Sequence, residues 1–192
     1  HYLRMFAGKP IALVERLVGG SITETTVSIC EQIGAAMGKM HAAGLSFEQH
    51  QPNPRGPHWF VETANALQEK LPADDLQILN DEIAFQKANR DAELPRGTVH
   101  ADLFRDNSLW DGDQLSGIID FYYANDDALL YDLAVTANDW CVLDNFSLYK
   151  DKVQAFLNGY HQYRPLTDVD QQSRPVPRRT GAPRLSLSRL YP

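Results

Sequence analysis

Cysteine is scarce in this sequence of 192 residues, which contains only Cys30 and Cys141. The two lie far apart, each within an apolar segment of helical spacing, so we expect buried thiols rather than a disulfide or a metal site. Such usage suits the reducing cytoplasm, where we expect the protein to reside. Long apolar runs are also absent, since none approaches the roughly 20 residues that cross a bilayer, and no signal-peptide pattern is present. We therefore expect no membrane partner.

Basic residues are outnumbered by acidic ones. The sequence has 18 lysines and arginines against 25 aspartates and glutamates, which gives a net charge of −7 and a pI near 5.3. Binding to a phosphate backbone needs clustered lysine and arginine, so a nucleic-acid partner is not expected. The hydrophobic fraction of 43% is typical of a globular domain with a hydrophobic core.

The glycine-rich loops that cradle nucleotide phosphates are missing as well. Neither the pattern GxxxxGK[ST] nor the pattern GxGxxG occurs in the sequence. The segments Gly8-Lys9-Pro10 and Val18-Gly-Gly-Ser21 are therefore predicted to be turns. A P-loop nucleotide-binding site is thereby excluded.

Apolar periodicity predicts a mixture of helices and strands. The run Ile11–Leu17 has β-branched members and predicts a strand. After it, the capping-box segment Ser21–Glu24 and an apolar period predict a helix over about 23–43. Further helices are predicted at 59–71, 74–88, 127–142 and 146–163, a strand at 98–99, and a hairpin at 108–110 and 115–119 around the turn 111–113. Beyond Arg164, prolines and arginines predict a poorly packed or disordered tail.

One polar block of the sequence indicates a chemical function. It consists of Thr98-Val-His-Ala-Asp-Leu-Phe-Arg-Asp-Asn107 and the later segment Gly117-Ile-Ile-Asp-Phe121. In phosphoryl transfer from ATP, a carboxylate accepts the proton of the attacking hydroxyl, while an amide oxygen and a second carboxylate hold Mg²⁺. Asp102 is the candidate base, and His100 is expected to support its loop through a hydrogen bond to the backbone. Asn107 and Asp120 are the candidate Mg²⁺ ligands, since hard Mg²⁺ takes oxygen donors.

Several residues around this block allow more than one interpretation. Arg105 could touch phosphate, balance the acidic cluster or form a surface salt bridge. Asp127 is interpreted as the N-cap of the next helix, and Asp132 as a brace for the catalytic loop. Asp139 and Trp140 could face a small cationic substrate or be structural.

The polar block and several flanking segments together resemble one known family. They are His100–Asn107, Ile118–Tyr122, Asn125–Ala134, Asn138–Cys141, Met40–Ser46 and Asn53–Gly56. On these segments the sequence is identified as a member of the aminoglycoside phosphotransferase and choline kinase superfamily, and it resembles the bacterial homoserine kinases within it. The resemblance covers residues 1 to about 164.

The resemblance implies an α+β, protein-kinase-like fold, mostly the helical C-terminal lobe with a catalytic β-hairpin and with the N-terminal lobe largely missing. Residues 1–20 would be the end of the N-lobe sheet and the hinge, 21–164 the kinase-like C-lobe, and 165–192 an atypical tail rich in proline and arginine. The implied reaction transfers the γ-phosphoryl group of ATP, with Mg²⁺, to L-homoserine, a step in threonine synthesis.

The resemblance also implies roles for residues outside the block. Leu13–Leu17 resembles the hinge whose backbone pairs with adenine, which makes Glu15, Arg16 and Leu17 candidates for nucleotide binding. Arg55 is a candidate partner for the carboxylate of an amino-acid substrate. From the residues themselves and not from the resemblance, Arg105 within the block and Asp139 and Trp140 beyond it are further candidate substrate contacts.

Two departures from the family leave alternatives open. The glycine loop and the phosphate-binding lysine of the N-terminal lobe are not in the sequence, so we expect a fragment. The tail after Arg164 also differs in composition from the family's helical end. The alternatives are a kinase of another small alcohol or amine, such as an aminoglycoside or a choline-like compound, and an inactive nucleotide-binding fragment.

Overall fold

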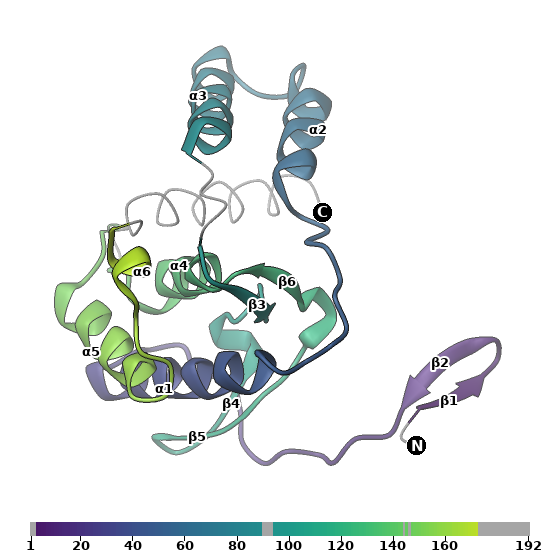
Figure 1. Ribbon diagram of the computed structural model, residues 1–192, viewed down its shortest axis with the longest axis vertical. Coiled ribbons are helices and arrows are strands. Elements are labelled where there is room, and N and C mark those ends of the chain that lie inside the picture. Colours follow the sequence, from purple (N-terminus) through teal and green to yellow (C-terminus); the bar gives the residue numbers. More distant parts are fainter. Residues whose placement is uncertain (1–2, 90–93, 144, 146, 173–192) are drawn as a thin grey trace.

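The computed structural model describes residues 3–89, 94–143, 145 and 147–172 (Figure 1). Its first elements, β1 (Leu3–Phe6) and β2 (Lys9–Ala12), form an antiparallel hairpin that extends away from the rest of the chain. Residues 13–19 follow without regular structure. The strand predicted over 11–17 is therefore wrong beyond Ala12, because no strand in the described part of the chain pairs with the exposed residues that follow it.

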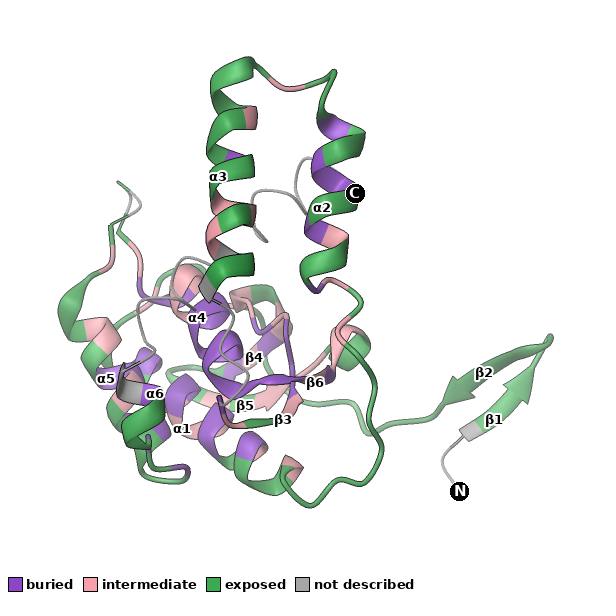
Figure 2. Cartoon of the chain, turned by 45° about the horizontal axis from the view of Figure 1, so that its top comes forward, coloured by how far each residue is buried: buried purple, intermediate pink, exposed green. Residues whose placement is uncertain are grey.

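Helix α1 (Val27–Gly44) packs along helix α5 (Lys150–His161), in a region of the fold where many residues are buried (Figure 2). The backbones approach closely, since a Cβ atom at Gly34 would collide with the carbonyl oxygen of Phe156. Thr26 is the N-cap, with its hydroxyl accepting a hydrogen bond from Ile29 N at 3.2 Å. The helix therefore begins four residues later than predicted, and the expected capping box does not start it.

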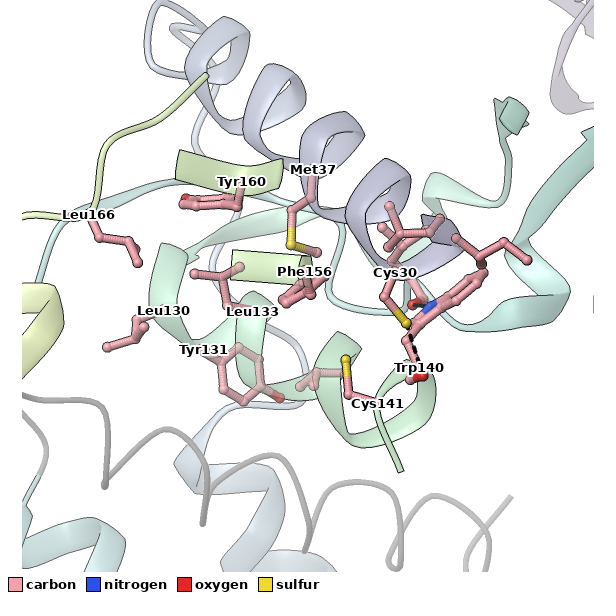
Figure 3. Packing of buried hydrophobic residues seen from close by; sticks show 14 of the residues in the cluster. Cys30, Met37, Leu130, Tyr131, Leu133, Trp140, Cys141, Phe156, Tyr160 and Leu166 are labelled. Carbon is pink, nitrogen blue, oxygen red and sulfur yellow. Dashed lines mark hydrogen bonds between the residues drawn. The ribbon is translucent and has the colours of Figure 1, made fainter. Parts of the chain in front are cut away.

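The main hydrophobic core lies between α1, α5 and the central helix α4 (Leu129–Trp140) (Figure 3). Both cysteines belong to it as free, fully buried thiols, as the sequence predicts. A hydrogen bond with the Cys30 thiol, and then burial, raise the pKa of Cys141, which keeps that thiol protonated. None of the helices in the described part of the chain is long and apolar enough to cross a membrane.

Two small antiparallel sheets carry the polar block. Strand β3 (Arg96–Val99) pairs with β6 (Asn125–Ala128), and β4 (Ser108–Asp111) pairs with β5 (Gln114–Ile118) around the predicted turn at Gly112. The 3₁₀ helices η1 (Arg105–Asn107) and η2 (Phe121–Tyr123) lie at the ends of this second pair. The prediction that Asp127 caps α4 is wrong, because it lies inside β6 and Ala128 precedes the helix.

Helices α2 (Pro57–Leu67) and α3 (Ala73–Asn89) form a hairpin that projects from this body (Figure 1). Their contact is a separate small cluster built on Phe60, Ala64, Leu67 and Leu79. Both helices were predicted, with ends that differ by a few residues.

The chain remains packed after α5, contrary to the poorly packed tail expected beyond Arg164. Leu166 joins the main core, and the guanidinium of Arg164 donates to the buried carboxylate of Asp170 at 2.7 Å. A short helix α6 (Asp168–Gln172) follows. The rest of the predicted tail lies outside the described residues.

Candidate active site

The loop after β3 has a strained conformation held by a buried carboxylate. Ala101 has φ of 63°, a left-handed conformation that residues other than glycine rarely adopt. Both oxygens of Asp132 accept hydrogen bonds here, one from His100 N at 2.9 Å and the other from Ala101 N at 2.7 Å. The interpretation of Asp132 as a brace for the catalytic loop is therefore confirmed, and Asp102 follows directly after the braced residues.

Asp132 is ionised despite complete burial. Burial raises the pKa of its carboxyl, but the hydrogen bond and electrostatic attraction of His41, the electrostatic attraction of His100 and the hydrogen bond from the His100 backbone together outweigh burial. The pKa therefore lies below its ordinary value. His41 Nε2 lies 3.0 Å from Asp132 Oδ2.

His100 is a buried link between the two halves of the site. Its Nδ1 atom accepts from Asp102 N at 3.3 Å, and its Nε2 atom donates to the carbonyl oxygen of Ile119 at 3.0 Å. The ring also lies 4.6 Å, centroid to centroid, from the ring of Phe121. The expected hydrogen bonding to the loop backbone is present.

Asn107 connects Asp102 to the strand that ends at Asp120. Its Nδ2 atom donates to Asp102 O at 2.8 Å and to Asp102 Oδ2 at 3.3 Å, which turns the amide oxygen to the other side of the group. Its backbone oxygen accepts from Ile119 N at 3.0 Å. Ile119 is thus held at both its N–H and its carbonyl group. The structure thus joins Asp102, Asn107 and Asp120 in one hydrogen-bonded group of segments, called the support from here on.

Asp120 is a second strained residue, with φ of 61°. Its carboxylate accepts from Tyr122 N at 3.4 Å, and the residue is exposed. Strained non-glycine residues cluster at functional sites because the surrounding structure must hold them. The strain at Ala101 and Asp120 therefore singles out the same two segments as the sequence motif.

The donor atoms of this support fit Mg²⁺. The amide oxygen of Asn107 and the carboxylate of Asp120 are hard oxygen donors, whereas a soft metal would need sulfur or imidazole. Among the described residues, no group of three or more His, Cys, Asp or Glu is placed to hold a metal ion. At nucleotide sites, Mg²⁺ takes a few protein oxygens and is completed by phosphates and water.

A cavity of about 620 Å³ opens beside Asp120. Its lining includes the three candidate nucleotide-binding residues Glu15, Arg16 and Leu17 on one side, and Ile119, Asp120 and Phe121 on the other. Such a volume lies within the range of small-molecule sites. Residues about 100 positions apart in the sequence, predicted separately to bind nucleotide and metal, therefore face one cavity.

Arg105 and Asp139 pair with each other. The carboxylate of Asp139 accepts from the Arg105 backbone N at 2.9 Å, from Nε at 3.2 Å and from a terminal nitrogen at 3.3 Å. Arg105 also donates to Thr23 O at 2.8 Å. Of the interpretations left open for Arg105, the structure contains the salt bridge. The pair fixes the start of η1 to α4.

Of the two interpretations left open for Trp140, a substrate contact and a structural role, the structure contains the structural one. Its side chain is completely buried in the main core, and its indole N–H donates to Leu103 O at 2.9 Å. A side chain without accessible surface cannot contact a ligand, so Trp140 is structural.

Arg55 lies between two aromatic rings beside η2. Its guanidinium carbon is 4.1 Å from the ring centroid of Tyr123 and 5.5 Å from that of Trp59, and it donates to the Tyr123 hydroxyl at 2.6 Å. Since Tyr123 follows Asp120 by three residues, Arg55 is brought to the edge of the same segment. Stacking fixes the plane of the guanidinium, which is the group that binds a carboxylate in two-point fashion.

Comparison with known proteins agrees with this geometry. Residues 2–166 match the phosphotransferase enzyme family. The chain belongs to this family.

Curated relatives are similar over nearly all of the chain. The homoserine kinase of Methylobacillus flagellatus is 44% identical over 183 residues, which are 95% of the chain and 57% of that protein. The homoserine kinase of a Janthinobacterium species is 42% identical over 189 residues, 96% of the chain and 59% of that protein. The chain thus spans less than two thirds of the length of these relatives.

Solved structures identify the fold. Choline kinase from Cryptosporidium parvum superposes with a TM-score of 0.69 at 14% identity, covering 93% of this chain and 63% of that one. Amicoumacin kinase superposes with a TM-score of 0.66 at 19% identity, covering 90% and 55%. The predicted α+β, protein-kinase-like fold is confirmed.

Three residues around the candidate site were not singled out from the sequence. His41 contacts Asp132 directly, and Tyr160 contacts it through His41. Tyr123 accepts a hydrogen bond from Arg55. His41 lies in a segment used for the family resemblance, which was the available signal. Tyr160 and Tyr123 occupy positions that the sequence alone does not distinguish from other aromatic residues.

Proposed function

We propose that the protein containing this chain is a homoserine kinase, which transfers the γ-phosphoryl group of ATP to the side-chain hydroxyl of L-homoserine. The observation that carries the proposal is the joining of Asp102 and Asp120 through Asn107 and Ile119. Phosphoryl transfer depends on such common support, because catalysis consists mainly of positioning and charge stabilisation. The identity of the homoserine kinase relatives supports the choice of acceptor.

In this proposal the chain divides at the boundaries expected from its sequence. Residues 1–20 form the end of the N-lobe sheet and the hinge, and 21–164 form the C-lobe. Residues 165–192 are set apart by their proline and arginine content, although 165–172 pack against the C-lobe. Backbone groups of Glu15, Arg16 and Leu17 bind the adenine of ATP, for which the shared cavity with Asp120 is the support. The reaction takes place in the cytoplasm, where ATP and free amino acids are available.

Asp102 acts as the base of the reaction. Its carboxylate accepts the proton of the homoserine hydroxyl and orients that oxygen toward the γ-phosphorus. Asn107 and Asp120 hold Mg²⁺, which supplies the positive charge that neutralises the phosphate oxygens. His100 keeps the Asp102 and Asp120 segments together and exchanges no proton with substrate. The salt bridge of Arg105 and Asp139 keeps η1 in place.

Arg55 provides the selectivity for an amino acid. A carboxylate needs a cationic partner with two parallel N–H groups, and the guanidinium of Arg55 is oriented by Tyr123 and Trp59. An aminoglycoside or a choline-like acceptor carries only positive charge, and it would be repelled by Arg55. This is the feature that separates homoserine from the other acceptors of the superfamily.

The test measures ADP formation by the full-length protein with Mg²⁺-ATP and each of four acceptors: L-homoserine, 3-amino-1-propanol, choline and kanamycin. The second acceptor is homoserine without its carboxylate. We expect turnover with homoserine, and a loss of about 10- to 100-fold in kcat/KM for 3-amino-1-propanol, because one charged hydrogen-bonded contact is lost. Higher kcat/KM for choline or kanamycin would contradict the proposal.

The variant Arg55→Met makes the test specific. It should lower kcat/KM for homoserine by about 10- to 100-fold and leave that for 3-amino-1-propanol nearly unchanged. The matched control is Arg96→Met, which removes a different partly exposed guanidinium, paired with Asp127 at 3.2 Å. Equal discrimination between the two acceptors in wild type and Arg55→Met would show that Arg55 does not bind the carboxylate.

A further inference from the structure

A chain of buried hydrogen bonds reaches the candidate catalytic loop from two distant helices. The hydroxyl of Tyr160 on α5 lies 2.8 Å from Nδ1 of His41 on α1. Nε2 of His41 lies 3.0 Å from Oδ2 of Asp132 on α4, and the same oxygen accepts from His100 N at 2.9 Å. Tyr160, His41 and Asp132 are called the relay from here on. All three are completely buried.

The relay places polar and ionisable side chains inside the hydrophobic core, where apolar residues are usual. Figure 3 shows Tyr160 within the apolar core, beside Met37 and Leu166. A buried ion pair gains little over apolar residues of similar size, since removal from water offsets its attraction. The stability of the fold is therefore a poor reason for placing a histidine and a carboxylate here. Control of the groups that the carboxylate contacts is a better one.

The hydrogen bond between His41 and Asp132 has only one possible direction. Burial raises the pKa of Tyr160, so its hydroxyl keeps its proton and hydrogen-bonds to His41 Nδ1. Nε2 of His41 carries the hydrogen that faces Asp132, whose ionised carboxylate can only accept. The tyrosine thus holds the histidine ring by its other nitrogen, and the histidine fixes the rotamer of the carboxylate that holds the left-handed Ala101.

We propose that Tyr160 and His41 are positioning residues for phosphoryl transfer, acting through Asp132 on the loop that carries Asp102. The proposal rests on the proposed kinase function, and it goes beyond it by assigning two residues that contact neither nucleotide nor acceptor. Without Tyr160 or His41, Asp132 is free to rotate, and the strained loop relaxes away from the geometry that Asp102 needs. The expected consequence falls on kcat and leaves substrate binding largely intact.

The kinetic test compares substitutions of nearly equal size in the full-length protein. Tyr160→Phe removes only the hydroxyl, and we expect kcat to fall about 10-fold while KM for ATP and homoserine changes less than about twofold. The matched control is Tyr131→Phe, which removes the same atom from a tyrosine of the same core cluster outside the relay. An equal fall of kcat in both variants would overturn the proposal.

Substitution of His41 provides a rescue experiment. Glutamine can donate from its amide nitrogen to Asp132, whereas methionine has a similar size and no donor. We expect His41→Gln to keep kcat within about threefold of wild type and His41→Met to lose about 10- to 100-fold. Equal kcat in the two variants, at equal melting temperature, would refute the positioning role.

A measurement independent of activity separates the relay from the kinase function. Hydrogen exchange of the His100 and Ala101 amides should accelerate in Tyr160→Phe and His41→Met, and should stay at the wild-type rate in Tyr131→Phe and His41→Gln. Unchanged exchange in all four would overturn the relay. If the wild-type protein phosphorylates no acceptor while exchange changes as expected, the kinase proposal fails and the relay stands as a loop brace.

Discussion

The imidazole of His100 donates a hydrogen bond to the carbonyl oxygen of Ile119 at 3.0 Å, which ties the residue two positions before Asp102 to the residue just before Asp120. The N–H of the same Ile119 is bound by the backbone oxygen of Asn107. A single peptide segment is therefore held from both sides by the motif residues. The candidate base and the candidate metal ligand cannot move independently.

This relationship predicts a loss of activity for His100→Leu. Leucine has a volume similar to that of histidine but makes neither of the two hydrogen bonds of the ring. We expect kcat to fall by about 10- to 100-fold, as for other groups that orient a reacting residue. His100→Gln retains a donor toward Ile119 and should recover most of that loss. Steady-state kinetics of the two variants, at matched melting temperature, is the measurement. Equal losses in both would mean that the hydrogen bond has no role in catalysis.

Asp120→Asn should weaken Mg²⁺ binding. Attraction between a carboxylate and a divalent ion about 4 Å apart is about 2 kcal/mol even in bulk water, so at least about a 10-fold higher Mg²⁺ concentration is needed at half-maximal activity. A titration of activity with Mg²⁺ at saturating ATP measures the shift. Asp113→Asn in the exposed turn between β4 and β5 is the control. If both variants behave alike, Asp120 does not bind the metal.

The close contact of α1 and α5 predicts a large loss of stability for Gly34→Ala. The added Cβ would meet the Phe156 carbonyl oxygen, which belongs to a helix backbone and cannot turn aside. Overpacking of this kind lowers the free energy of unfolding by about 1–3 kcal/mol. Gly20→Ala is the control, because a Cβ there meets nothing within 4 Å. Urea unfolding decides, and equal midpoints for the two variants would contradict the packing.

The buried carboxylate of Asp132 predicts a loss of stability in acid. Its pKa is lower in the folded than in the unfolded chain, so its stabilising effect is complete above about pH 4 and is lost as pH falls through the folded pKa. Unfolding free energy measured by urea between pH 3 and pH 7 should therefore depend on pH less steeply in Asp132→Asn than in wild type. Parallel pH profiles would show that Asp132 titrates normally.

Much of the site could be predicted from the sequence because its residues lie within one short block. The order of His100, Asp102, Asn107 and Asp120 reflects a chemistry that requires a base and oxygen ligands close together. The hairpin between Asn107 and Asp120 was likewise predictable, because Asp-Gly between apolar residues favours a tight turn. The expected brace at Asp132 was also correct.

The errors arose where tertiary contacts override local pattern. The sequence could not decide between a substrate contact and a structural role for Trp140, because its burial follows from the central position of α4 in the fold. The β-branched run after Ala12 met no partner strand in the described residues, so strand propensity alone did not extend β2. The partners of Asp132 could not be found either, since His41 and Tyr160 meet only when α1 packs on α5.

The central claim is that the site built around Asp102 phosphorylates the hydroxyl of homoserine. Phosphorus NMR of the full-length protein with Mg²⁺-ATP and L-homoserine tests it most directly, with wild type and Asp102→Asn compared side by side. We predict an O-phosphohomoserine resonance whose rate of appearance is lower by about 10²- to 10⁴-fold in Asp102→Asn. No such resonance from wild type, or the same rate from both proteins, would contradict the claim.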